Sequence, residues 1–272
     1  MSATTFARQP APHAGVTLPR VIRSEWTKLW SLRSTRWSLL FACISMAGLG
    51  PLIAAITMAR WNQLGALRQQ TLNVVDRSLG GYHLAQLAIG VLGVMVISGE
   101  YSTGMIRSSL MAVPKRLPVL WAKILVFGSV AFVLMLVTAL IGFYSSQAIF
   151  TEHHVNVTLS SPHALRALLG CVLFMTVTGV LCTALGTIIR STAGSISAYV
   201  GLMFVLPGIN AILPSSLSNS INPYLPSTAG TAVASAFPQA HAFSPWGGFA
   251  LFCGYALAAV VIAACLLRTK DA

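Results

Sequence analysis

Charged side chains are scarce in this sequence, and acidic side chains are the scarcest. Only 8% of its 272 residues are charged and only five are acidic, whereas 56% are hydrophobic. A soluble domain carries about 25% charged residues, so this composition excludes a soluble globule. The net charge of +12 does not indicate nucleic-acid binding, because the basic residues lie beside apolar segments and give no basic face on a soluble fold. Basic residues placed in this way are typical of membrane proteins.

Several chemical signatures are also missing. None of the four lysines follows a glycine, so the chain has no Gly-Lys-Ser/Thr phosphate-binding loop and is not expected to hydrolyse nucleotide by itself. No carboxylate lies in the middle of an apolar run, which disfavours an ion-driven carrier. The five cysteines fall in apolar runs without metal-ligand spacing, and the run Glu152-His153-His154 matches no standard metal motif. We therefore expect no catalytic residue, no metal and no cofactor in this chain.

Six apolar segments are long enough to cross a membrane, which takes roughly 20 residues. They lie at about 37–58, 79–98, 119–143, 164–188, 194–213 and 246–267. The sequence therefore predicts an all-α polytopic membrane protein, with a six-span transmembrane domain over 37–267 and a short tail over 268–272. We expect Pro207 to kink the fifth span, because proline cannot donate a helical hydrogen bond.

The distribution of basic residues predicts the orientation of the spans. With six spans both termini lie on one side, and that side carries 13 Lys and Arg against 4 on the other. Cytoplasmic loops carry the excess of basic residues, so we expect a multi-pass protein of the cell membrane with both termini in the cytoplasm.

The N-terminal flank divides into two parts. Residues 1–19 are rich in Ala, Pro and Thr and are expected to form a disordered tail. In residues 20–36 the apolar side chains fall at helical spacing and the basic ones lie largely elsewhere, as in a helix in the headgroup plane. A plain basic flank to the first span is the alternative. The candidate residues of this interfacial helix are Trp26, Lys28, Trp30 and Arg33.

The polar loop 99–118 follows the second span and is predicted to be cytoplasmic. Glu100, one of the five acidic residues, stands at its start, and three basic residues follow. We interpret this loop as the place where a partner protein acts; a simple helix-end cap is the alternative role of Glu100. The candidate residues of the loop are Glu100, Tyr101, Gly104, Arg107, Lys115 and Arg116.

Two further features lie toward the opposite side. The long segment 214–245 carries no Lys, Arg, Asp or Glu, which leaves a solvated loop and a re-entrant segment as open alternatives. Within the spans, His83, Gln86 and Asn210 are candidates for a water-filled or substrate-lined path, because polar groups there are costly. The threonines of the spans are expected to bond to their own or neighbouring helices.

Several stretches together resemble the actinobacterial permeases of the type-2 ABC exporter family. The stretches Ser-Glu-Trp-Thr-Lys-Leu at 24–29 and Ser-Leu-Arg-Ser-Thr-Arg-Trp at 31–37 are similar to the opening of those permeases. Gly-Glu-Tyr-Ser-Thr-Gly-Met at 99–105, followed by Pro-Lys-Arg at 114–116, is similar to their loop after the second span. Tyr-Leu-Pro-Ser-Thr-Ala-Gly at 224–230 is similar to a segment before their last span.

The resemblance implies a transmembrane subunit of an exporter that pairs with a second permease copy or a related permease. Separate ATPase subunits, which bind ATP and Mg²⁺, would dock on its cytoplasmic loop. Glu100 would then anchor that loop through charge-assisted hydrogen bonds, with Arg107, Lys115 and Arg116 as secondary contacts. The family also implies that 20–36 is the interfacial connecting helix and that 214–245 includes re-entrant helices. The alternative is an ATPase-independent membrane protein, either a structural or assembly factor or an atypical membrane enzyme.

Overall fold

The computed structural model describes residues 17–65, 69, 71–106, 111, 117–237 and 242–269. These residues are mainly helical and contain no strand. Six helical segments among them are long and apolar enough to cross a membrane, which confirms the predicted all-α polytopic class. Those segments are Arg33–Ala59, Tyr82–Ser102, Leu117–His153, Ala164–Ile189, Thr192–Ile212 and Pro245–Thr269.

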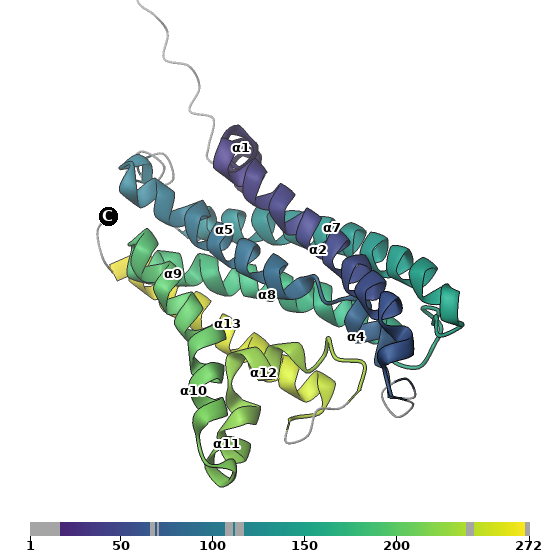
Figure 1. Ribbon diagram of the computed structural model, residues 1–272. Coiled ribbons are helices and arrows are strands. Elements are labelled where there is room, and N and C mark those ends of the chain that lie inside the picture. The colour runs from purple at the N-terminus through teal and green to yellow at the C-terminus, as the bar shows by residue number, and fades with distance from the viewer. Residues whose placement is uncertain are drawn as a thin grey trace, which may run out of the picture.

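Figure 1 shows the arrangement of the elements. They are α1 (Leu18–Ser31), α2 (Arg33–Ala59), η1 (Trp61–Gln63), α4 (Val74–Ser78), α5 (Tyr82–Ser102), α7 (Leu117–Phe150), η2 (Thr151–His153), α8 (Ala164–Ile189), α9 (Thr192–Val200), the π-helical turn η3 (Gly201–Val205), α10 (Leu206–Ile212), α11 (Ser215–Ile221), η4 (Asn222–Tyr224), α12 (Pro226–Thr231) and α13 (Pro245–Thr269).

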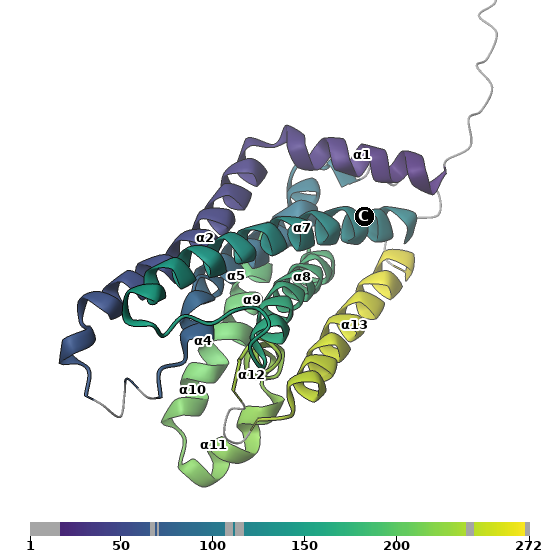
Figure 2. The same cartoon turned by 90° about the vertical axis from the view of Figure 1, so that its right-hand side faces the viewer.

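The first helix is separate from the first span. Leu32 has an extended backbone, with φ −83° and ψ 123°, so α1 ends at Ser31 and α2 begins at Arg33. The helical segment expected over 20–36 is therefore broken inside its last third. Figure 2 shows α1 lying across the end of the bundle, with α2 leading away from it at a sharp bend. This bend sets α1 apart from the span that it precedes.

The faces of α1 explain its position. Val21, Glu25 and Leu29 are buried and recur every fourth residue, so they form one face of the helix, which packs against α7. Trp26 and Trp30 lie on the exposed side. A helix with one buried face and two exposed tryptophans is typical of the membrane interface.

Helices α5 and α8 pack against each other closely because glycines line their contact. A Cβ added to Gly93 would lie 2.6 Å from the backbone oxygen of Gly179, and one added to Gly90 would lie 2.2 Å from the ring of Tyr199 on α9. Helix α2 packs on α7 and α5, and α13 packs on α8. Small residues allow such close approach of helices within a membrane.

The fifth span, in which the sequence predicts a kink at Pro207, is irregular. Its three pieces are α9, the π-helical turn η3 and α10, and Pro207 stands at the start of α10 directly after that turn. Proline lacks the N–H that would bond to the turn before it. Helices α10 and α11 extend away from the main bundle, and α12 returns to pack on α13 (Figure 1).

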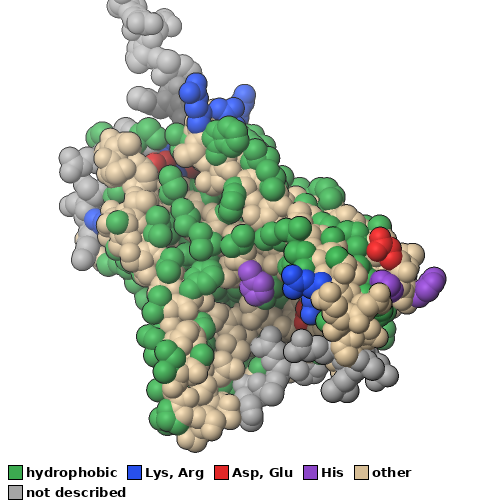
Figure 3. Space-filling model, in the orientation of Figure 1, with side chains coloured by type: hydrophobic (Ala, Val, Ile, Leu, Met, Phe, Trp, Pro, Cys, Tyr) green, Lys and Arg blue, Asp and Glu red, His purple; other side chains and the backbone are tan. Residues whose placement is uncertain are grey.

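The outer surface of the bundle suits a lipid environment. Large hydrophobic side chains of the spans are exposed, among them Ile44, Val133, Ile141 and Leu257. In the face shown by Figure 3, hydrophobic side chains are spread over much of the bundle, and Lys and Arg side chains lie both at the end where α1 lies and near the opposite end, beside histidines. We call the end where α1 lies the α1 end of the bundle. The C-terminal ends of α5 and α8 also lie there.

Candidate functional site

Four charged side chains meet at the α1 end, where α1, α5 and α7 converge. Glu25 and Lys28 lie one turn apart on α1, Glu100 stands in the last turn of α5, and Lys123 stands in the second turn of α7. We call these four residues the charge cluster. Glu25 and Glu100 are each 5% exposed and Lys123 is 2% exposed, so three of the four charges are buried.

Lys123 joins the two carboxylates. Its Nζ donates to Glu25 Oε2 at 2.6 Å, to Glu100 Oε1 at 2.7 Å and to the backbone oxygen of Val96 at 3.3 Å. These three hydrogen bonds use all three ammonium hydrogens. A lysine this deeply buried is expected to have acidic partners, and here it draws them from two other helices.

Lys28 completes the cluster from its partly exposed edge. Its Nζ donates to Glu25 Oε1 at 2.7 Å and to Glu100 Oε1 at 3.0 Å. Burial lowers the pKa of Lys28, but the hydrogen bonds and charges of Glu25 and Glu100 outweigh it and raise that pKa above its ordinary value. The two acids and two bases balance in charge.

The two carboxylates are not equally satisfied. Each oxygen of Glu25 accepts from one lysine, whereas both lysines donate to Oε1 of Glu100. Oε2 of Glu100 is buried and has no hydrogen-bond donor among the described residues. An unpaired buried polar atom costs free energy, so this oxygen is an acceptor that a further donor would stabilise.

The last turns of α5 contact two more helices. The ring of Tyr101 lies under the guanidinium of Arg190, the residue that ends α8, with the guanidinium carbon 5.4 Å from the ring centroid. Thr192, the first residue of α9, donates its hydroxyl to Ser98 Oγ at 2.9 Å. The end of α5 is thus tied to α1 and α7 by ion pairs and to α8 and α9 by these contacts.

Comparison with known proteins identifies the family. The model of a family described as ABC-2 family transporter protein matches residues 21–208. The chain belongs to the ABC-2 transporter family. It is therefore a permease of an ABC transporter and a multi-pass membrane protein, which confirms the family predicted from the sequence motifs. No curated protein matches the chain significantly.

The structure places three of the predicted loop residues of this ABC-2 permease. Glu100 lies inside the charge cluster, and Tyr101 lies against Arg190. Gly104 is exposed and has φ +70°, a left-handed conformation that glycine adopts readily, so it turns the chain just after α5 ends. Arg107, Lys115 and Arg116 lie outside the described residues.

The predicted residues of the interfacial helix divide between two surroundings. Trp26 and Trp30 are exposed, and their rings meet edge to face with centroids 5.8 Å apart. Lys28 points instead into the charge cluster. Arg33 is exposed at the first residue of α2. Helix α1 of the permease therefore presents aromatic rings on one side and its paired charges on another.

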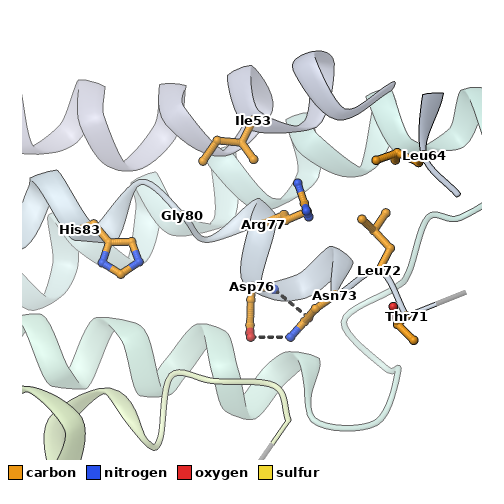
Figure 4. Close-up of a pocket in the computed structure, with 9 residues that line it drawn as sticks. All are labelled: Ile53, Leu64, Thr71, Leu72, Asn73, Asp76, Arg77, Gly80 and His83. Atoms are coloured by element: carbon orange, nitrogen blue, oxygen red, sulfur yellow. Dashed lines mark hydrogen bonds between the residues drawn. The ribbon is translucent and has the colours of Figure 1, made fainter. Parts of the chain in front are cut away.

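The three candidates for a substrate path lie in different surroundings. His83 is exposed near the start of α5, while Gln86 is buried one turn later, and the Tyr199 hydroxyl donates to its backbone oxygen at 2.8 Å. Asn210 is on α10, and its amide nitrogen lies 3.5 Å from Asn222 Oδ1. The side-chain oxygens of Gln86 and Asn210 are buried without a donor among the described residues. Only His83 borders the pocket of Figure 4.

That pocket lies at the other end of the bundle, beside α4 (Figure 4), and has a volume of about 530 Å³. Asp76 and Asn73 are hydrogen-bonded to each other within it, and Asp76 Oδ1 also accepts from the backbone N–H of Ala236 at 2.8 Å. Burial raises the pKa of Asp76 despite these hydrogen bonds and the charge of Arg166. Arg77 donates to Thr57 Oγ1 at 2.9 Å. Helix α4 thereby holds α2 and the segment after α12 together.

The sequence analysis missed two members of the charge cluster, Glu25 and Lys123. The signal was present: Lys123 lies in an apolar run, where a lysine needs an acidic partner, and the chain has only five acids. Glu25 lies three residues before Lys28, which is the spacing of neighbours on a helix. The sequence did not reveal that Glu25 and Glu100 share the same two lysines.

Proposed function

We propose that this permease is the transmembrane subunit of an ATP-driven exporter and that its 99–118 loop couples it to separate ATPase subunits. Those subunits would bind ATP and Mg²⁺ and carry out hydrolysis, and a second copy or a related permease would complete the translocation path. The family supports a permease of an ABC transporter; the coupling route is inferred from the charge cluster.

The observation that carries this proposal is the charge cluster itself. The first four residues of the predicted 99–118 loop are the last turn of α5, which ends at Ser102, so a force applied to the rest of the loop reaches that turn first. There, ion pairs connect Glu100 to Lys28 on α1 and to Lys123 on α7, and Lys123 also pairs with Glu25 on α1. A joint of this kind favours movement of the helices as rigid bodies over bending of the loop.

Glu100 acts within the chain in this proposal. Its carboxylate is buried and accepts hydrogen bonds from two lysines. It would therefore fix the position of the end of α5, from which the loop continues. Direct contact with the ATPase would fall to exposed residues that follow it, such as Thr103, Gly104 and Met105. Contacts by the basic residues farther along the loop remain a prediction. The role of Glu100 is thus positional.

The orientation in the membrane is part of the same proposal. We place the α1 end in the cytoplasm of the cell, with both chain termini on that side, because the basic residues predicted to be cytoplasmic outnumber the others by 13 to 4. Trp26 and Trp30 would then anchor α1 among the lipid headgroups of the inner leaflet. The ATPase subunits would approach from the same side.

The cargo path is proposed to involve the spans that bear unpaired buried polar groups. Gln86 on α5 and Asn210 on α10 each hold a buried oxygen that has no donor in the described part of the chain, and a second permease or a cargo molecule would supply one. The short helices α11 and α12 of the 214–245 segment would be its re-entrant part. Export is the direction that the resemblance implies.

Affinity purification from the native membrane in mild detergent tests the coupling. We expect the wild type to bring down a protein with a phosphate-binding loop, and Glu100→Ala to lose most of it. Glu152→Ala, which removes an exposed acid from η2, is the matched control and should retain the partner. The unfolding temperature of each variant separates loss of coupling from loss of folding.

Either of two results would contradict the proposed coupling. If a folded wild-type permease brings down no such protein, or if folded Glu100→Ala retains it fully, the proposed coupling is wrong. The ATPase-independent alternative would then gain support.

A further inference from the structure

The exposed face of α2 begins with two arginines. Arg33 is the first residue of α2 and Arg36 stands one turn later, and both side chains are exposed. Residues three and four apart lie on the same face of a helix, so Trp37 and Leu40 share this face with the arginines. The four side chains line a surface pocket of about 460 Å³. We call it the arginine pocket.

The apolar part of this face continues along the span. Trp37 is 70% exposed, and Leu40, Phe41 and Ile44 are exposed after it, whereas the opposite face of α2 packs on α5 and α7. Tryptophan is enriched at the depth of the lipid headgroups, and a spanning helix is apolar where it crosses the hydrocarbon. The arginine pocket therefore lies where headgroups meet acyl chains.

The described part of the chain does not balance the charge of the two arginines. Neither guanidinium has a hydrogen-bond or ion-pair partner there. The carboxylates described at the α1 end are Glu25 and Glu100, and both are buried in the charge cluster. Like charges one turn apart on a helix repel each other. An anion bound between Arg33 and Arg36 would remove that repulsion and accept hydrogen bonds from both side chains.

Charge and shape together select an anionic phospholipid as the ligand. Arginine holds a phosphate group through two parallel N–H···O bonds, and the exposed apolar side chains next to the arginines offer a surface to acyl chains. A phosphatidylcholine brings its own ammonium group to a place that is already positive, and an uncharged lipid leaves the guanidinium groups unpaired. A second copy of this chain has no exposed carboxylate at its α1 end among the described residues, so it offers the arginines no partner.

We propose that the arginine pocket binds an anionic phospholipid, with its phosphate held by Arg33 and Arg36 and its acyl chains along Leu40 and Ile44. Trp37 packs where the head of the lipid meets the chains. Anionic lipids attract basic residues close to the membrane surface, and the two arginines make that attraction local. Binding does not rest on the proposed function. The assignment of the site to the inner leaflet does, because it follows from placing the α1 end in the cytoplasm.

The test is native mass spectrometry of the full chain released from nanodiscs. The nanodiscs contain equal amounts of phosphatidylglycerol and phosphatidylcholine with the same acyl chains, so the two lipids differ only in the head. We expect the chain to retain phosphatidylglycerol about tenfold more than phosphatidylcholine, since the attraction of two basic residues to an anionic head is worth at least that much in binding.

Two double variants locate the binding. Arg33→Gln with Arg36→Gln should lose most of the preference for phosphatidylglycerol. Arg23→Gln with Arg268→Gln is the matched control, because it removes the same charge from exposed arginines on α1 and in the last turn of α13, and it should keep the preference. Glycerol phosphate added from water should not displace the lipid at millimolar concentration, because it has no acyl chains.

Four results would overturn the proposal. Equal retention of the two lipids by the wild type would show that the pocket does not select charge, and this comparison needs no variant. An unchanged preference in the Arg33 and Arg36 double variant would place the lipid elsewhere, and an equal loss in both double variants would reduce the effect to general surface charge. Displacement by glycerol phosphate would make the ligand a phosphate from solution. The assay needs no ATPase, so its failure is distinct from failure of the proposed function.

Discussion

Lys123 should be the most sensitive position of the charge cluster. It is almost fully buried and donates to Glu25, Glu100 and the backbone oxygen of Val96. Lys123→Met keeps the length of the side chain but leaves two carboxylates facing one lysine. Removal of one partner from a buried ion pair costs about 3–5 kcal/mol, and we expect a loss of that size. The assay is the free energy of unfolding in mixed micelles of mild detergent and dodecyl sulfate.

Two further variants separate the ionic contribution from packing. Lys28→Met removes a side chain that is 27% exposed, so it should cost about 1 kcal/mol, as partly exposed pairs do. The double variant Lys123→Met with Glu100→Gln restores charge balance and should recover about half of the loss or more, because neutral replacements of buried ion pairs are often tolerated. Equal costs for the two lysine variants, or no recovery in the double variant, would refute the reasoning.

Three other predictions concern packing, backbone conformation and pH. Gly90→Ala should lower the free energy of unfolding by about 1–3 kcal/mol, because the added methyl group overpacks against Tyr199. Gly48 has open space around it, so Gly48→Ala should change that free energy by less than about 1 kcal/mol in the same assay. Gly104→Val should lower the free energy of unfolding by about 1–2 kcal/mol, because Gly104 has φ +70° and valine adopts that conformation at a cost. A variant as stable as the wild type would show that the turn changes its conformation. The raised pKa of Lys28 means that its stabilisation is fully present below pH 10.5 and lost as pH rises through the folded pKa. The stability difference between wild type and Lys28→Met should therefore narrow above pH 10.5, and a constant difference would contradict this.

The spans and the family could be predicted from the sequence because their signals are local. A run of roughly 20 apolar residues identifies a span wherever it packs, and the six segments all appear as helices. Pro207 gave the place of the irregular turn in the fifth span for a similar reason, since its missing N–H affects its own helix. The break at Leu32 was not predicted, because leucine favours helix and neither proline nor glycine marks a helix end there.

The charge cluster depends on distant residues, and this is why its form was missed. Glu25 and Lys123 are 98 positions apart in the chain, and only the packing of α1 on α7 brings them together. The sequence marked Glu100 as unusual because acids are few, but it gave no measure of how deeply the carboxylate is buried.

The most direct test of the coupling proposal is photo-crosslinking from the exposed residues just after α5 in native membranes. A photoreactive amino acid at Met105, which is 45% exposed, would report contacts at the α1 end, and one at Leu165, which is 51% exposed at the start of α8, would report contacts at the other end. The account predicts an adduct between position 105 and a protein with a phosphate-binding loop, and none from position 165. Adducts with such a protein from position 165 alone, or from neither position, would contradict it.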